Sequence, residues 1–279
     1  WDLLANEYEK QELEDWGMDV DKWVDEEVVE DDVPEVTENP VSKPGEIYQL
    51  GRHRVMCGDS TKIEDVEKLM DGKKADLFIS DPPYGMRLDT NYSGMHGMHR
   101  GKNHEKVIGD NEDFDAQTIL PMVVNIPEQI WFGADYYGHS LGDTEHTGSW
   151  CVWDKRVEES QDKGFGSCFE LLWSKKKHKR MIYRYQWAGF FTQGEKRDFD
   201  HPTEKSARLV GHLVKDYSKD GDIVLDLFGG SGSTLIACEQ TNRICYGMEI
   251  DPKYIDVIRK RYAKFIGKEE EWEKITPKI

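Results

Sequence analysis

The stretch Asp222–Gln240, DIVLDLFGGSGSTLIACEQ, decides the fold. An apolar run ends at Asp226, a glycine-rich turn follows, and a helical pattern begins near Ser233. Glycines permit a tight turn and let a ligand approach the backbone, and a helix N-terminus favours a carboxylate or phosphate. The next apolar run places Glu249 at its end, where a carboxylate can accept two ribose hydroxyls. The pattern predicts a nucleoside-cofactor site and lacks the spacing of a nucleoside-triphosphate P-loop.

Outward from this stretch, short apolar runs alternate with helical patterns, which favours a largely parallel sheet with helices on both faces. We expect seven strands, in the runs RVMCG, ADLFIS, QIWFGA, SWCVWD, FELLWS, DIVLDLF and ICYGMEI. We expect helices at about residues 63–70, 116–124, 204–217, 234–240 and 254–265. In such α/β sheets, ligand sites lie beyond the carboxyl ends of the strands.

Charge divides the 279 residues into two parts. The formal net charge is −18, and residues 1–45 carry 16 acidic and 3 basic side chains. Residues 1–45 are therefore predicted to be an acidic appendage, with a linker over 25–44, and residues 46–279 to be the folded domain. The sequence has no apolar run long enough to cross a membrane and no CxxC pair among its five cysteines. These features predict a cytoplasmic protein with reduced thiols and no metal site.

The catalytic prediction rests on ADLFISDPPYGM, in which an apolar strand delivers Asp81, Pro82, Pro83 and Tyr84 to the sheet's carboxyl edge. The two prolines stiffen the backbone and end the ladder of strand hydrogen bonds. A carboxylate beside a fixed carbonyl can accept both hydrogens of an exocyclic amine, and a tyrosine ring can stack on a planar heterocycle. An ordinary Asp-Pro turn is the alternative interpretation of the same letters.

With these two motifs in this order, residues 46–266 resemble the amino-group DNA methyltransferases of the permuted beta group. These enzymes use S-adenosylmethionine to form N6-methyladenine or N4-methylcytosine. The resemblance implies a Rossmann-like methyltransferase fold, with DPPY as the catalytic motif and LDLFGGSGST as the cofactor motif. The N-terminal segment resembles the tail of a ParB-like domain found fused to phage and bacterial methyltransferases.

The resemblance also implies a set of cofactor-binding residues. CGDS carries an Asp that contacts the cofactor adenine, and HPTEK holds the methionine carboxylate, although Ser206 follows where a proline is usual. The implied cofactor residues are Asp59, Asp81, His201, Thr203, Lys205, Asp226, Phe228, Gly229, Gly230, Ser231, Gly232, Ser233, Thr234 and Glu249.

Two basic stretches are candidates for contact with a nucleic acid. Residues 175–200 combine eight basic and three acidic side chains with interleaved aromatic rings, and residues 85–110 form a glycine-rich, basic loop after DPPY. Cations that neutralise phosphates, beside rings that stack on bases, suit a nucleic-acid groove, and a mobile loop suits a lid over a flipped base. The named candidates are Lys175, Lys176, Lys177, Lys179, Arg180, Arg184, Arg100 and Lys102. A solvated basic hairpin is the alternative.

The predicted activity is N6-adenine methylation of double-stranded DNA by base flipping and direct transfer, with a short or relaxed recognition site. Asp at position 81 favours adenine, since serine is more usual in N4-cytosine enzymes. The N4-cytosine enzyme, an RNA or protein amide methyltransferase, and a catalytically silent nucleic-acid-binding subunit remain alternatives. The family also includes homodimers, and the resemblance points to a prokaryotic or phage source and a role in restriction-modification.

Overall fold

The computed structural model describes residues 28–29, 31–83, 114–156, 167–185, 187–188, 191–192 and 205–279. Its central feature is a mixed sheet in the order β1-β2-β11-β10-β3-β4-β6-β5-β7. The strands of this sheet are β1 (Ile47–Leu50), β2 (His53–Cys57), β3 (Leu77–Ser80), β4 (Glu128–Phe132), β5 (Ser149–Asp154), β6 (Phe169–Ser174), β7 (Ile182–Arg184), β10 (Ile223–Asp226) and β11 (Ile244–Glu249). A separate pair joins β8 (Trp187–Ala188) to β9 (Phe191–Thr192).

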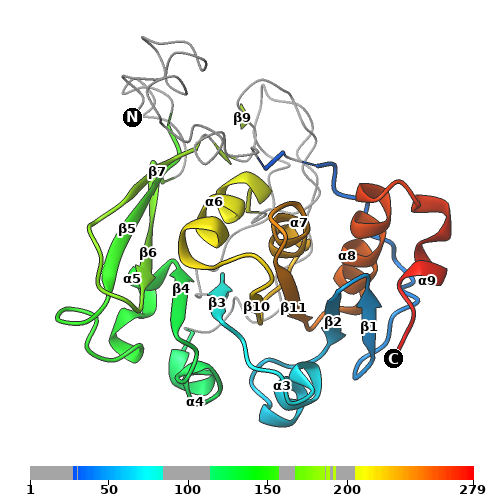
Figure 1. Cartoon of the computed structure of the whole chain (residues 1–279), viewed down its shortest axis with the longest axis horizontal. Coiled ribbons are helices and arrows are strands. Elements are labelled where there is room, and N and C mark those ends of the chain that lie inside the picture. The colour runs from blue at the N-terminus through cyan, green and yellow to red at the C-terminus, as the bar shows by residue number, and fades with distance from the viewer. Residues whose placement is uncertain are drawn as a thin grey trace, which may run out of the picture.

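Helices cover both faces of the sheet (Figure 1). One layer contains α6 (Ala207–Tyr217), α7 (Ser233–Gln240) and α8 (Pro252–Phe265). The opposite layer contains α3 (Ile63–Met70) and α4 (Leu120–Val123). Shorter helices are η3 (Ala116–Thr118), α5 (Ala134–Tyr137), η4 (Gly138–Ser140), η6 (Glu269–Glu271) and α9 (Trp272–Ile275). The predicted fold class, a doubly covered α/β sheet, is confirmed.

Alternating burial in the central strands explains why both faces need helices. In β3, Leu77 and Ile79 belong to the apolar cluster that includes α6, α7 and α8. Phe78, between them, belongs to the other cluster, with Val66 and Leu69 of α3. Because successive strand residues point to opposite faces, a strand that is apolar at every position requires a cover on each side.

Strand directions agree with the sequence in the centre of the sheet and differ from it at the edges. From β2 through β11, β10 and β3 to β4, all neighbouring strands are parallel. β6 runs antiparallel to both β4 and β5. The described sheet has nine strands where seven were expected, because β1 and β7 are short edge strands of three or four residues.

Local sequence chemistry sets the helix boundaries. The expected helix over 116–124 is divided into η3 and α4, with Pro121 in the first turn of α4. Proline lacks a backbone donor, so it fits a first turn and not a helix interior. Ser206 caps α6 by accepting a hydrogen bond from the Leu209 amide at 3.2 Å, which gives a physical reason for serine at this position.

Residues 28–44 differ from the solvated linker that their composition predicts. Val28 is buried against Gly211 of α6, where an added Cβ would lie 2.5 Å from a Val28 methyl carbon. Farther along, the Asp256 carboxylate accepts hydrogen bonds from the Val41 amide at 2.7 Å and the Ser42 hydroxyl at 2.6 Å. Buried apolar and carboxylate contacts, invisible to composition, fix this stretch to the helical layer.

Asp256→Asn is predicted to lower the free energy of unfolding by about 3 kcal/mol, because it removes a buried charge that three donors of Val41 and Ser42 and the Arg259 guanidinium share. The measurement is urea denaturation. Asp220→Asn is the matched control, since Asp220 is exposed although it lies 2.9 Å from the Arg243 guanidinium. Equal, negligible losses in both variants would contradict the prediction.

Candidate cofactor and catalytic site

Four predicted acidic residues meet at the carboxyl edge of the parallel strands. Asp81 follows β3, Asp226 ends β10, Glu249 ends β11 and Asp59 follows β2. The registers align these ends, since Asp226 pairs with Gly247 and Glu249 pairs with Cys57. Residues that are 190 positions apart in the sequence therefore share one edge of the sheet, as the parallel arrangement requires.

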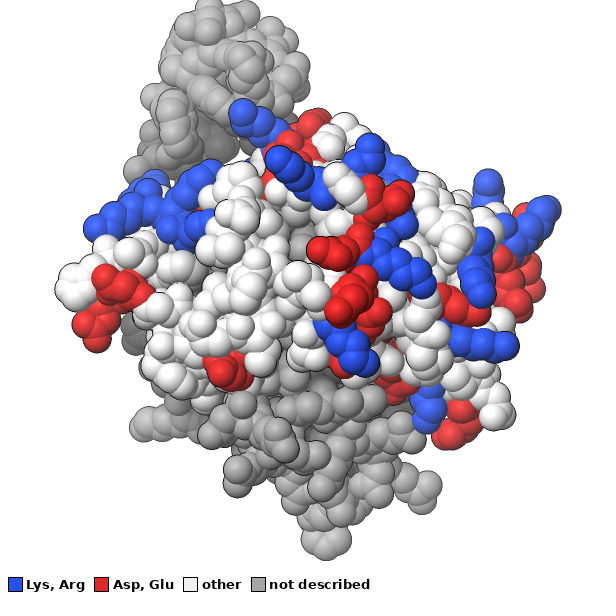
Figure 2. Space-filling model, turned by 90° about the horizontal axis from the view of Figure 1, so that it is seen from below, with Lys and Arg blue, Asp and Glu red and all other residues white. Residues whose placement is uncertain are grey.

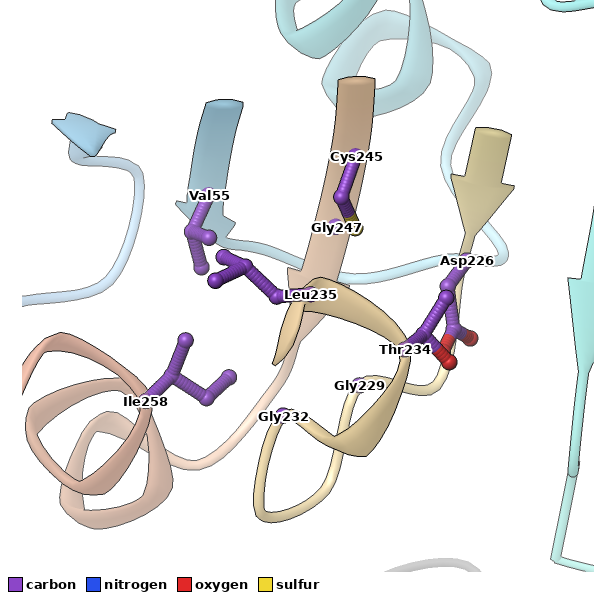
Figure 3. Close-up of a pocket in the computed structure, with 9 residues that line it drawn as sticks. All are labelled: Val55, Asp226, Gly229, Gly232, Thr234, Leu235, Cys245, Gly247 and Ile258. Carbon is purple, nitrogen blue, oxygen red and sulfur yellow. The ribbon is translucent and has the colours of Figure 1, made fainter. Parts of the chain in front are cut away.

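The Asp226 carboxylate connects several elements beside the glycine-rich turn. Its buried carboxylate accepts hydrogen bonds from the Thr234 hydroxyl at 2.6 Å, the Ser80 hydroxyl at 2.8 Å and the Phe228 amide at 3.0 Å. Figure 3 shows the Asp226 and Thr234 side chains side by side next to the turn, in a small pocket also lined by Val55 and Ile258. Burial raises the pKa of Asp226, against these hydrogen bonds. The carboxylate joins β3, β10 and α7.

The predicted cofactor loop, Gly229–Gly232, is held by hydrogen bonds to the end of β11 and has free space beside Gly230. The Gly229 amide donates to the Met248 carbonyl at 2.8 Å, and the Gly230 amide donates to Glu249 Oε2 at 2.9 Å. Gly230 and Gly232 have φ values of 50° and 90°, which favour glycine. A Cβ at Gly230 would meet no described atom within 4 Å, whereas one at Gly232 would lie 3.0 Å from Ile258.

The two serines of the loop region point toward protein groups. The Ser233 hydroxyl donates to the Lys205 carbonyl at 2.6 Å, and the Arg261 guanidinium contacts both Ser233 Oγ and Ser231 Oγ, at 3.2 and 3.0 Å. Both side chains are buried. Their hydroxyls therefore stabilise the loop from within.

Glu249 and Asp59 lie at the carboxyl ends of two adjacent strands, β11 and β2, and Glu249 contacts the loop. Glu249 also accepts from the Asp251 amide at 2.9 Å, and burial raises its pKa to about 7. Asp59 accepts from the Thr61 hydroxyl at 2.7 Å and lies 3.3 Å from the Lys62 ammonium. The free space beside Gly230, with one carboxylate at each of two adjacent strand ends, fits the ribose and adenine of S-adenosylmethionine.

Asp81 belongs to a four-residue charged cluster that the sequence does not reveal. The Lys205 ammonium lies 2.8 Å from Asp81 Oδ2 and 3.4 Å from Glu170 Oε2. The Lys155 ammonium lies 2.7 Å from Glu170 Oε1. Two ammonium groups and two carboxylates thus alternate in a row, beside the ring of Trp153.

The second Asp81 oxygen receives no hydrogen bond from the described residues. This oxygen, Oδ1, is buried. Burial raises the pKa of Asp81 to about 6; the Lys205 ammonium opposes this effect, and the Glu170 and Asp226 carboxylates reinforce it. Burial also acts to raise the pKa of Glu170, but Lys205 and Lys155 outweigh it and lower that pKa overall. A buried acceptor without a donor is costly unless a ligand supplies one.

Of the remaining predicted site residues, some lie within the described part of the chain and others lie outside it. Pro82 is buried, Pro83 is half-buried, and Phe228 packs edge-to-face on Phe114 with ring centroids 5.8 Å apart. The predictions for Tyr84, Arg100, Lys102, His201 and Thr203 lie outside the described residues, as does the proposed loop over 85–110.

The predicted basic groove is divided between two edges of the sheet. β6 is antiparallel, so Glu170 near its start lies at the carboxyl edge while Ser174 at its end lies at the opposite edge. Ser174 pairs with Ile130, which pairs with Ile79, and the basic residues follow Ser174 away from Asp81; they are Lys175, Lys176, Lys177, Lys179 and Arg180. Arg184 alone among the six returns to the carboxyl edge, paired with Asp154 along β7.

Lys175 serves the fold, because its ammonium donates to the Val124 and Ile126 carbonyls at 2.5 and 2.7 Å. Its pKa is lowered by burial. The other five basic side chains of this set are exposed. Figure 2 shows one face of the molecule, on which acidic and basic side chains are interspersed, so the net negative charge does not form a uniform acidic surface there.

Sequence reasoning missed three residues that shape the site: Glu170, Lys155 and Arg261. Lys155 could have been found as a charged residue after an apolar strand, the same signal that identified Asp81, whereas Glu170 lies near the start of β6 and carries no such signal. Arg261 has no such signal, since it lies within a helix rich in basic residues.

Comparison with known proteins agrees with this geometry. The sequence model of the family described as "DNA methylase" matches residues 75–260. Type II methyltransferase M.HpaI of Haemophilus parainfluenzae is 39% identical over 238 residues, which cover 75% of this chain and 73% of that protein. Type II methyltransferase M2.DpnII of Streptococcus pneumoniae is 31% identical over 108 residues, 33% of this chain and 40% of that protein's length.

A solved structure shares the fold across most of the chain. The cytosine-N4-specific PvuII DNA methyltransferase superposes with a TM-score of 0.51 at 14% identity, covering 84% of this chain and 96% of that one. With the family match, these findings show that the chain belongs to the DNA methylase family. The predicted cofactor, S-adenosylmethionine, is confirmed at the level of this family. None of the described helices is long and apolar enough to span a membrane.

Thr234→Val is predicted to reduce the free energy of unfolding by about 2 kcal/mol, because it removes a hydrogen bond to the buried Asp226 carboxylate. Thr241→Val is the matched control. Thr241 is equally buried near the same helix but donates to the neutral Ala237 carbonyl at 2.7 Å. Chemical denaturation of both variants tests whether the charge of the Asp226 carboxylate makes the difference. A larger loss of unfolding free energy in Thr241→Val would contradict the stabilising role of Asp226.

Proposed function

We propose that this DNA methylase transfers the methyl group of S-adenosylmethionine to the exocyclic N6 amine of adenine in DNA. The observation that carries the proposal is the buried, unpaired Asp81 Oδ1 at the end of β3, at the same edge as the cofactor loop. This oxygen needs a ligand that donates hydrogen bonds to it without protonating the carboxylate. An exocyclic amine is such a ligand.

The chain's own residues would position the amine. S-adenosylmethionine supplies an electrophilic methyl group on a sulfonium. Asp81, with the carbonyl of Pro82 beside it, would accept the two amine hydrogens, which favours a pyramidal nitrogen with its lone pair directed at that methyl carbon. Lys205 would hold Asp81 in place through the 2.8 Å contact, and the proton lost by the amine would leave by way of the Asp81 carboxylate.

Glu249 and the Gly230 backbone would hold the nucleoside part of the cofactor, with Asp59 directed at its adenine. Lys205 would also attract the methionine carboxylate, since it carries the positive charge nearest to Asp81. In this proposal, residues at the carboxyl edge bind the flipped base. Of the six basic candidates that the structure describes, Arg184 is the one at the carboxyl edge, on the edge strand β7, and it would contact DNA there.

N4-cytosine methylation is the second candidate, because the geometry at Asp81 suits either exocyclic amine and the PvuII enzyme, which shares the fold, is cytosine-N4-specific. Aspartate at position 81 favours adenine. Nucleoside mass spectrometry of unmethylated DNA, incubated with the protein and S-adenosylmethionine, separates the two. N6-methyladenine supports the proposal and N4-methylcytosine replaces it. No methylated base, with cofactor bound, would favour a silent subunit or an RNA substrate.

Asp81→Ala is predicted to reduce methyl transfer by at least about a thousandfold, because it removes the acceptor that orients the amine. Cofactor affinity should change far less, since the loop and Glu249 remain. Incorporation of labelled methyl groups into DNA measures the first, and calorimetric titration the second. Glu64→Ala, at an exposed position of α3, is the control and should retain full activity. Unchanged turnover in Asp81→Ala would remove this residue from the mechanism.

Single-turnover methyl transfer is predicted to rise with pH through about pH 6, because Asp81 must be ionised to accept hydrogens and its pKa is about 6. Below that pH the protonated carboxyl cannot serve. Glu170→Gln should move this acid limb to lower pH, because the Glu170 carboxylate raises the pKa of Asp81. The Lys205 and Asp226 charges stay in place in the variant. If the acid limb of the pH profile does not move in Glu170→Gln, a group other than Asp81 controls it.

A further inference from the structure

The cofactor loop is fastened on its inner side by a residue that the methylation mechanism does not use. Arg261, in the middle of α8, is almost completely buried. One nitrogen of its guanidinium donates to the Ser231 carbonyl at 3.1 Å and the Ser231 hydroxyl at 3.0 Å. Because Ser231 lies between the two glycines with positive φ, this contact fixes the most conformationally free part of the loop.

The other side of the same guanidinium is neutralised by the N-terminal segment. Arg261 Nε and Nη2 lie 2.7 and 2.6 Å from the two carboxylate oxygens of Asp31, a bidentate pair 230 positions apart in sequence. The exposed fractions of the two side chains are 1% and 12%. A buried guanidinium is stable only when a partner neutralises it, so Asp31 determines whether Arg261 stays against the loop.

The segment around Asp31 is held by several contacts with the helical layer. The Val29 amide donates to Gln240 of α7 at 2.8 Å, and the Gln240 amide donates back to the Val29 carbonyl at 2.8 Å. Val28 fills the space over Gly211 of α6. Residues 28, 29, 31 and 32, which we name the strap, therefore contact α6, α7 and α8, the helices of one layer over the sheet (Figure 1).

We propose that the strap presets the cofactor loop through Arg261, which makes Asp31 a positioning residue for S-adenosylmethionine binding. The inference rests on the cofactor site described above. On the outer side, Glu249 holds the Gly230 amide; on the inner side, Asp31 and Arg261 hold Ser231. A loop fixed at both points loses less conformational entropy when a ligand binds, so its affinity is higher.

Asp31→Asn is expected to weaken S-adenosylmethionine binding about tenfold in calorimetric titration, the size usual for a supporting contact one residue removed from a ligand. Loop amides at Gly230 and Ser231 should also exchange hydrogen faster in the cofactor-free protein. In turnover, the KM for S-adenosylmethionine should rise while kcat at saturation stays within about twofold. A loss of overall stability alone would not produce this split.

Asp32→Asn is the matched control, because Asp32 is the next acid along the strap but is exposed and lies 3.5 Å from Lys264. It should bind S-adenosylmethionine as the unmodified chain does. An equal loss in both variants would overturn the proposal, since charge and not the Arg261 contact would then explain it. Unchanged affinity and exchange in Asp31→Asn would overturn it as well.

A double variant, Asp31→Leu with Arg261→Met, covers the case in which Asp31→Asn does not fold. It replaces the buried ion pair by apolar side chains of similar volume, which often preserves stability. A folded double variant that binds S-adenosylmethionine about tenfold more weakly supports the proposed role of the strap. A folded double variant with unaltered affinity refutes it. If the unmodified chain itself binds no S-adenosylmethionine, the proposed cofactor site is refuted, and the proposed role of the strap is refuted with it.

Discussion

The buried carboxylate of Asp226 is the constraint on which both halves of the site depend. Its partners come from the residue before Asp81, from the turn after β10 and from the first turn of α7. The segment that carries Asp81, the proposed catalytic residue, and the loop proposed to hold the cofactor are therefore fixed to one point. A buried carboxylate tolerates such a role only when donors surround it, which explains serine at 80 and threonine at 234.

Much of the fold could be predicted from local patterns. β5 and β6 begin and end where the apolar runs SWCVWD and FELLWS do, and α3 spans the expected 63–70. Periodicity is a local property, so it identifies such elements. It could not predict the helix break at Pro121 or the three-residue strand β7, because a short element is stabilised mainly by its neighbours.

The site could be predicted only where chemistry follows a strand end in sequence. Asp81, Asp226 and Glu249 were predicted in this way, and they lie at one edge of the sheet. The basic residues after Ser174 were misplaced relative to Asp81, because composition does not show that β6 runs antiparallel and carries them to the far edge. The pairs Lys205–Glu170 and Arg261–Asp31 join distant segments, and a single sequence holds no signal of such contacts.

The raised pKa of Glu249, about 7, couples ligand binding to proton exchange with the solvent. Hydroxyl groups that donate to this carboxylate would stabilise its ionised form, so a nucleoside bound there would lower the pKa and release a proton. Binding would then grow tighter as the pH rises toward neutrality, and its apparent heat would depend on the ionisation enthalpy of the buffer. The same carboxylate that orders the loop in the free protein would act as a proton donor to the medium when the site fills.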